Sequence, residues 1–147
     1  MMSNVTDREM MSRALKLAAK GRFTSSPNPT VGCVITVDGK VVGEGFTRPA
    51  GGNHAEIEAL QSAGDVTGAT AYVTLEPCCH QGKTGPCTDA LIAAGVVRVV
   101  VACEDPNPKV AGLGLAALLA AGIEVQSGLL EDQARNINKG FIKRHEQ

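Results

Sequence analysis

The sequence predicts an α/β fold, a three-layer sandwich in which a mixed β-sheet carries helices on both faces. Two observations predict it. A helical segment and a hairpin are followed by helices and strands in alternation, which is the pattern of an α/β domain. In addition, the Val-rich run at residues 96–102 has the composition of a strand buried on both faces of a parallel sheet. The 147 residues suit one domain, so we expect residues 1–147 to form a single unit.

The first elements are a helix and a hairpin. Thr6-Asp7-Arg8-Glu9 has capping-box spacing, in which the hydroxyl caps the helix and Glu9 reaches back to the cap. Apolar residues follow at helical spacing, and Gly21 is placed to end the helix. After a loop at 21–30, strands at 31–37 and 40–45 flank Asp38-Gly39, a turn favoured in hairpins.

The rest of the chain alternates helices and strands. Ligands of open α/β sheets bind beyond the carboxyl ends of strands, so the loops after residues 75 and 102 are the informative ones. The predicted elements are a helix at 54–63, a strand at 71–75, a loop at 76–86, a helix at 88–94, a strand at 96–102, a loop at 103–112, a helix at 113–121, a strand at 123–126 and a helix at 130–138.

Composition excludes several classes of protein. The 14 Lys+Arg against 15 Asp+Glu leave a net charge of −1 and no global field for a polyanion, so we expect no nucleic-acid partner. The longest nearly apolar stretch, residues 110–123, is shorter than the roughly 20 residues needed to span a bilayer, so we expect no membrane association. Charged residues at 7–9 interrupt any export signal, so a cytoplasmic location is expected. The five cysteines are then ligands, nucleophiles or core residues before they are disulfides.

Three pieces of sequence together suggest a zinc site: His54-Ala55-Glu56, Pro77-Cys78 and Cys87. One imidazole and two thiolates are the three protein ligands that a catalytic zinc keeps while its fourth position holds water. His54 and Cys87 are each expected near a helix start, where the helix dipole favours a thiolate.

Glu56 is the candidate proton carrier. Two residues along a regular helix point about 200° apart, so the site requires His54 at the cap or first position of its helix. Gly51-Gly52-Asn53 just upstream supports that placement. Glu56 then reaches the metal-bound water without ligating the metal, takes its proton and returns it to a leaving nitrogen. His-x-Glu with Pro-Cys-x-x-Cys is the general signature of zinc deaminases, but here eight residues separate Cys78 from Cys87.

The other cysteines have simpler interpretations. A closed structural site would need a fourth ligand such as Cys79 or His80. Cys79 adjoins Cys78 too closely for both to bind the same metal easily. A closed site would also leave Glu56 without a catalytic role. Cys33 and Cys103 are expected to be small core residues.

Several motifs together resemble the deaminase domain of the bifunctional deaminase–reductase family of riboflavin biosynthesis. The similarity runs from about residue 7 to residue 144, and the long segment between the cysteines is usual in that family. The motifs are PNPTVGCV (27–34), GNHAE (52–56), TLEPCCHQGKT (74–84), DPNP (105–108) and NKGF (138–141).

The resemblance implies a cytidine-deaminase-like fold and a zinc-dependent hydrolase. It implies Zn²⁺ on His54, Cys78 and Cys87 with Glu56 as proton shuttle. The reaction would release ammonia from 2,5-diamino-6-(5-phosphoribosylamino)pyrimidin-4(3H)-one and give 5-amino-6-(5-phosphoribosylamino)uracil. The substrate-binding positions implied are Asn28, the backbone N–H of Ala55, Lys83, Asp105 and Asn107.

The resemblance also bears on partners. A reductase domain usually follows the deaminase domain in this family, and we expect it to be absent from this chain, either because the chain was trimmed or because this member stands alone. The reductase would then be fused in a longer protein or supplied separately. A dimer or larger homo-oligomer is implied.

Two alternatives remain open from the residues themselves. The enzyme could deaminate another base or nucleoside, such as cytosine, guanine or tRNA adenosine, although the near-neutral charge disfavours tRNA and Lys83 favours a small phosphorylated substrate. The second alternative is a structural-zinc module without catalysis. In the absence of the resemblance, Asn28 would suit a turn, Lys83 a solvated charge, and Asp105 with Asn107 a rigid loop.

Overall fold

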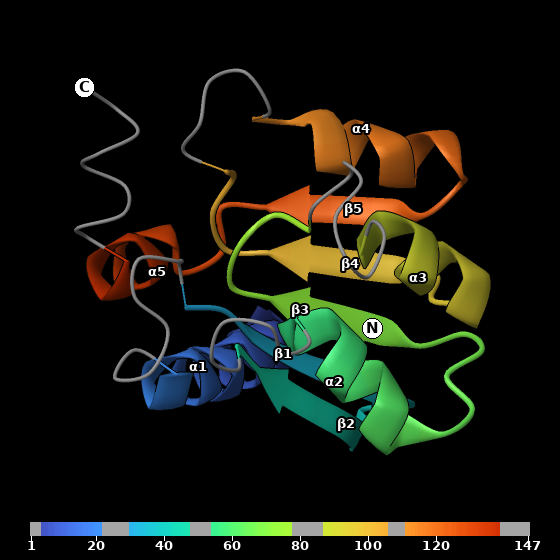
Figure 1. Cartoon of the computed structure of the whole chain (residues 1–147), viewed down its shortest axis with the longest axis horizontal. Helices are drawn as coiled ribbons and strands as arrows, with labels where there is room; N and C mark the ends of the chain where they lie inside the picture. The colour runs from blue at the N-terminus through green and yellow to red at the C-terminus, as the bar shows by residue number, and fades with distance from the viewer. Residues whose placement is uncertain (1–3, 22–29, 48–53, 78–86, 106–110, 139–147) are drawn as a thin grey trace.

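A computed structural model describes residues 4–21, 30–47, 54–77, 87–105 and 111–138. They form five helices around one five-stranded sheet (Figure 1). Every predicted helix and strand is present, with ends that differ by no more than two residues except at the start of the first helix. In chain order the elements are α1 (Asn4–Gly21), β1 (Gly32–Val37), β2 (Lys40–Phe46), α2 (Ala55–Ala63), β3 (Thr70–Val73), α3 (Cys87–Ala94), β4 (Arg98–Val101), α4 (Leu113–Ala120), β5 (Glu124–Ser127) and α5 (Glu131–Ile137).

The sheet is mixed, as predicted. Its strand order is β2-β1-β3-β4-β5; β1 pairs antiparallel with β2 and β3, whereas β3, β4 and β5 are parallel. Positive φ angles at Asp38 (52°) and Gly39 (80°) are those of the primed turns that match the twist of a two-stranded hairpin. The predicted hairpin is therefore confirmed.

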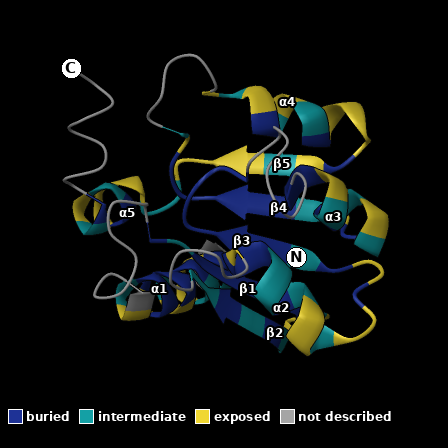
Figure 2. Cartoon of the chain, in the orientation of Figure 1, coloured by how far each residue is buried: buried dark blue, intermediate teal, exposed yellow. Residues whose placement is uncertain are grey.

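The sheet forms the middle of three layers. On one face α2, α3 and α4 contribute Ala59, Leu91 and Leu118 to an apolar core, and on the other face α1 and α5 contribute Met11 and Ala134 to a second. Successive strand residues alternate between the two cores because side chains along a strand point to opposite faces. The central strands are accordingly buried, whereas exposed residues lie on the helices and on the edge strand β5 (Figure 2).

The two sheet edges are short or irregular. β5 has four residues and exposes Glu124 and Gln126, whereas β2 begins at the exposed Lys40. The pairing of β2 with β1 shifts register between Ile35 and Thr36.

Helix α4 is apolar throughout. It buries Gly114 and Leu118 but leaves Leu113 and Leu119 50% and 58% exposed. None of the helices in the described ranges has the length and apolar character of a membrane span.

The capping box predicted at residues 6–9 is wrong. Helix α1 begins at Asn4, so Thr6 lies inside the helix. The neighbouring Asp7 is buried and makes a tertiary contact: its two carboxylate oxygens accept hydrogen bonds from Arg98 at 3.0 and 2.8 Å, and Tyr72 donates to one of them at 2.7 Å. The guanidinium of Arg98 holds the pKa of Asp7 below its usual value, and burial together with Asp7 raises the pKa of Tyr72 to about 12. This network joins α1 to β3 and β4.

Candidate metal centre

The start of α2 provides two of the predicted site residues. His54 is the N-cap, with an extended backbone (φ −70°, ψ 161°), and its carbonyl accepts the first helical bond from Glu58 at 3.0 Å. His54 thus occupies the irregular position that the two-residue spacing to Glu56 requires. Its side chain is exposed, whereas Glu56 is 4% exposed.

Close packing of α2 on β2 fixes that helix start. A methyl group at Gly45 would lie 2.3 Å from the Ala55 carbonyl oxygen, and one at Gly43 would lie 2.4 Å from that of Ala59. Glycine at both positions of β2 lets the helix lie directly on the strand.

Helix α3 begins at Cys87, which is completely buried. The sequence predicted Cys87 just before the helix, and the structure makes it the first helical residue. A thiol at this position faces the positive end of the helix dipole, which favours its ionised form.

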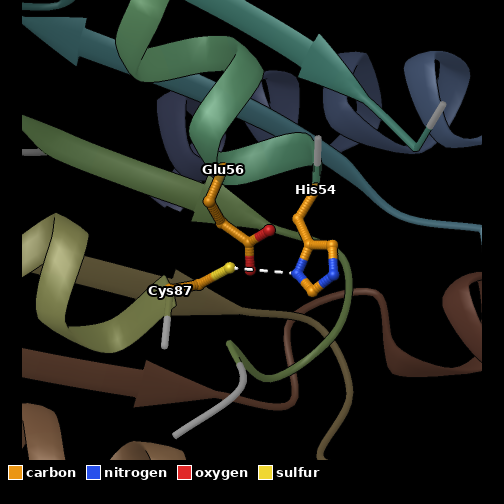
Figure 3. Close-up of side chains that lie close together, drawn as sticks. All are labelled: His54, Glu56 and Cys87. Carbon is orange, nitrogen blue, oxygen red and sulfur yellow. Dashed lines mark hydrogen bonds between the residues drawn. The ribbon is translucent and has the colours of Figure 1, made fainter. Parts of the chain in front are cut away.

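The side chains of His54, Glu56 and Cys87 converge in front of the sheet (Figure 3). Their ligand atoms all lie within 4.8 Å of one another, and His54 Nδ1 is 3.2 Å from Cys87 Sγ. Ideal zinc bonds to nitrogen and sulfur place those two atoms about 3.5 Å apart across a tetrahedral angle. The nitrogen and sulfur donors therefore fit a shared zinc ion.

Several predicted site residues lie outside the described residues. They are Asn28, Cys78, Lys83 and Asn107, together with Cys79 and His80. Among the described residues, the cluster consists of His54, Glu56 and Cys87.

Two other cysteines are core residues, as predicted. Burial and the nearby Glu56 carboxylate raise the pKa of the Cys33 thiol well above its usual value, so Cys33 stays protonated in β1. Cys103 is 2% exposed and donates to the Glu104 carbonyl at 3.2 Å.

Two predicted substrate-binding positions are described. Ala55 is the first residue of α2, where backbone N–H groups have no acceptor within the helix. Asp105 follows β4 and is half-buried, and its backbone N–H donates to the Glu76 carboxylate at 3.0 Å.

Glu76 is a residue whose role the sequence reasoning missed. Its side chain is 6% exposed and accepts four backbone N–H bonds, from Asp105 and from the start of α4. The only available signal was its place in the TLEPC segment, which gives no indication of these donors.

The chain matches one protein family and is similar in sequence to named proteins of riboflavin biosynthesis. A family model, "Cytidine and deoxycytidylate deaminase zinc-binding region", matches residues 4–103. The riboflavin biosynthesis protein RibD of Escherichia coli is 61% identical over 139 residues, which are 94% of this chain and 38% of that protein. The diaminohydroxyphosphoribosylamino-pyrimidine deaminase of Buchnera aphidicola subsp. Schizaphis graminum is 53% identical over 94% of this chain and 95% of its own length.

A solved structure of Acinetobacter baumannii RibD superimposes with a TM-score of 0.96 at 51% identity, over 99% of this chain and 41% of that one. The chain thus spans about two fifths of the length of these RibD relatives and nearly all of the Buchnera protein. The predicted cytidine-deaminase-like fold is confirmed.

Proposed function

Because this chain belongs to the cytidine and deoxycytidylate deaminase family, we propose that it catalyses a zinc-dependent deamination in riboflavin biosynthesis. The proposed substrate is 2,5-diamino-6-(5-phosphoribosylamino)pyrimidin-4(3H)-one, which loses ammonia to give 5-amino-6-(5-phosphoribosylamino)uracil. The observation that carries the proposal is the convergence of His54, Glu56 and Cys87. The Buchnera relative, 95% of whose length this chain covers, is named a diaminohydroxyphosphoribosylamino-pyrimidine deaminase, which supports the choice of substrate.

The proposed zinc ligands are His54, Cys87 and Cys78. Zn²⁺ held by three protein ligands lowers the pKa of a coordinated water to about 7 and so supplies a nucleophile at neutral pH. Two thiolates balance the charge of the ion. The start of α3 favours the thiolate form of Cys87, and the cap position of α2 turns the His54 ring toward it.

Glu56 carries the proton in this proposal. Its carboxylate lies beside the His54 and Cys87 ligand atoms and is almost completely buried, so bulk water does not compete for it. It accepts a proton from the attacking water and donates it to the nitrogen that leaves as ammonia. The backbone N–H of Ala55 is assigned to donate to the carbonyl oxygen of the pyrimidinone ring.

Substrate recognition is assigned to Asn28, Lys83, Asp105 and Asn107. Lys83 supplies a positive charge for the phosphate, and the amide and carboxylate groups bind the polar edges of the aminopyrimidine and ribose. Asp105 extends from the carboxyl end of β4, the side of a sheet on which ligands of such folds bind.

The test is an ammonia-release assay on the zinc-loaded protein with a panel of substrates. The diaminopyrimidine phosphate should be turned over, whereas cytosine, guanine, their nucleosides and tRNA should not. Turnover of another base with no reaction of the diaminopyrimidine would replace the proposed substrate. Absence of reaction with every compound would favour a structural-zinc module.

Cobalt substitution distinguishes an open metal site from a closed one. In an open site, the visible absorption of Co²⁺ should change when a substrate analogue is added, because the fourth position then responds to the ligand. A spectrum that stays unchanged at saturating analogue would indicate four protein ligands and would contradict the catalytic proposal.

Three further features belong to this proposal. We assign residues 1–147 to one zinc-dependent deaminase domain, with the following reduction carried out by a fused or separate reductase.

We expect a homo-oligomer, for which the exposed apolar side of α4 at Leu113 and Leu119 is a suitable surface. Light scattering during gel filtration tests this. We propose a reducing compartment such as the cytoplasm, in which Cys33 and Cys103 remain thiols, as they are in the structure.

A further inference from the structure

The carboxylate of Glu76 binds backbone N–H groups at both ends of the segment 105–112. Its Oε1 accepts hydrogen bonds from the backbone N–H groups of Asp105 and Gly112, both at 3.0 Å. Its Oε2 accepts from Gly114 at 2.7 Å and from Leu115 at 3.2 Å. With 6% of its surface exposed, Glu76 makes these bonds largely out of solvent, where an unmatched charge would be costly.

Glu76 replaces the missing cap of α4. The N-cap of that helix is Gly112, in the left-handed conformation, and it makes no side-chain cap bond. A methyl group at Gly114 would lie 2.2 Å from the Pro77 carbonyl oxygen and 3.1 Å from the Glu76 Cγ, so the helix start rests directly on residues 76–77. A carboxylate there also matches the positive end of the α4 dipole.

The backbone of Glu76 provides a second connection. Its N–H donates to the Cys103 carbonyl at 2.8 Å, which joins the end of β3 to the end of β4. Glu76 therefore joins the segment that leads to Cys78, two residues on, to the segment that carries Asp105.

We propose that Glu76 is a positioning residue, which sets the place of Asp105 relative to the cluster of His54, Glu56 and Cys87 by holding both ends of the segment 105–112 on one carboxylate. The inference rests on the proposed function, because Asp105 is there assigned to the substrate. Glu76 itself touches neither the substrate nor the metal in this proposal. Its effect is expected on substrate binding, while metal content and the chemical step stay nearly unchanged.

The four backbone N–H donors explain why residue 76 is a glutamate. A carboxylate offers two acceptor oxygens, and each is used by two N–H groups. Glutamine has the same shape, but its NH₂ group would face two N–H donors, so half of the bonds would be lost and replaced by repulsion. Glu76→Gln is therefore a sharp probe that removes little volume.

The test compares Glu76→Gln with Glu104→Gln, which makes the same charge change at an exposed residue next to Asp105. In Glu76→Gln we expect one zinc per chain, a KM raised at least tenfold and a kcat within threefold of wild type. Amide hydrogen exchange at Asp105, Gly112, Gly114 and Leu115 should quicken at least tenfold. Glu104→Gln should match wild type in all four measurements.

Two results would overturn the inference. One is a KM within twofold of wild type, with or without a loss of kcat, and the other is unchanged exchange at the four amides. Exchange is measured without substrate, so it decides whether Glu76 holds the segment even if wild type fails to deaminate the proposed substrate. If Glu76→Gln does not fold, Glu76→Asp keeps both oxygens on a shorter side chain; its KM should rise at least threefold with zinc retained, and an unchanged KM would refute the inference.

Discussion

Asn138 and Thr30 are 108 residues apart in the sequence, yet the side-chain amide of Asn138 pairs with both backbone groups of Thr30. The Thr30 N–H donates to Asn138 Oδ1 at 2.7 Å, and Asn138 Nδ2 donates to the Thr30 carbonyl at 2.8 Å. Both residues are buried. The end of α5 is thereby tied to Thr30, which lies two residues before the start of β1 and two residues after the proposed substrate-binding Asn28.

Asn138→Ala should therefore destabilise the protein by about 2–3 kcal/mol, because it leaves a buried N–H and a buried carbonyl without their partners. Urea unfolding followed by circular dichroism measures this. Asn136→Ala, at an exposed position of α5, is the matched control and should change stability by less than about 0.5 kcal/mol. Equal unfolding midpoints for the two variants would contradict the proposed contribution of this pair.

Glu56→Gln should keep one zinc per chain while losing about 10²–10⁴-fold in kcat, because the amide cannot transfer the proton. Metal analysis and the ammonia-release assay check both parts. Glu58→Gln makes the same change on the same helix, outside the cluster, and should stay close to the wild-type rate. A wild-type kcat in Glu56→Gln would contradict the proposal that Glu56 carries the proton.

Gly45→Ala should weaken zinc binding at least tenfold, because the added methyl group meets the Ala55 carbonyl and pushes the start of α2 away from its place. Competition with a chromophoric chelator measures the affinity. Gly43→Ala creates a comparable clash near Ala59, further along α2, and should lower stability by about 1–3 kcal/mol with little effect on zinc. Equal loss of zinc affinity in both variants would show that the helix shifts as a whole.

Asp7→Asn should lower the free energy of unfolding by about 3 kcal/mol at pH 7, because the partly buried Arg98 loses its buried carboxylate partner and keeps only the exposed carboxylate of Glu124. The pKa of Asp7 is lower in the folded than in the unfolded protein, so its charge stabilises the fold above the unfolded pKa of about 3.9 and ceases to do so as the pH falls through the folded value.

Urea unfolding at a series of pH values therefore checks the direction of the pKa shift of Asp7. The difference in free energy of unfolding between wild type and Asp7→Asn should stay constant from pH 7 to about pH 5 and narrow below about pH 4. Glu9→Gln, at an exposed position of α1, is the control and should differ little from wild type at any pH. A difference in free energy of unfolding between wild type and Asp7→Asn that grows as the pH falls would contradict the lowered pKa of Asp7.

Local patterns were sufficient to predict the elements and part of the site. Hydrophobic periodicity and the Asp38-Gly39 turn located the helices and the hairpin. The spacing of His54 and Glu56 led to the cap position that the structure has. These predictions succeed because each depends on residues within one or two turns of chain.

Contacts between distant residues could not be predicted. Thr6 to Glu9 matched a local capping motif, but Asp7 pairs with Arg98, 91 residues away. Glu76 likewise binds the start of α4, 38 residues along at Gly114. A single carboxylate in a sequence gives no information on which distant N–H groups will surround it, because the topology decides this.

The form of the two sheet edges has a consequence for behaviour in concentrated solution. Aggregation by strand addition needs a long, flat and uncharged edge, and neither β2, with its register shift and Lys40, nor the four-residue β5, with Glu124, offers one. Copies that associate are therefore expected to meet through helical surfaces. The open sheet can thus stay colloidally stable without closing into a barrel.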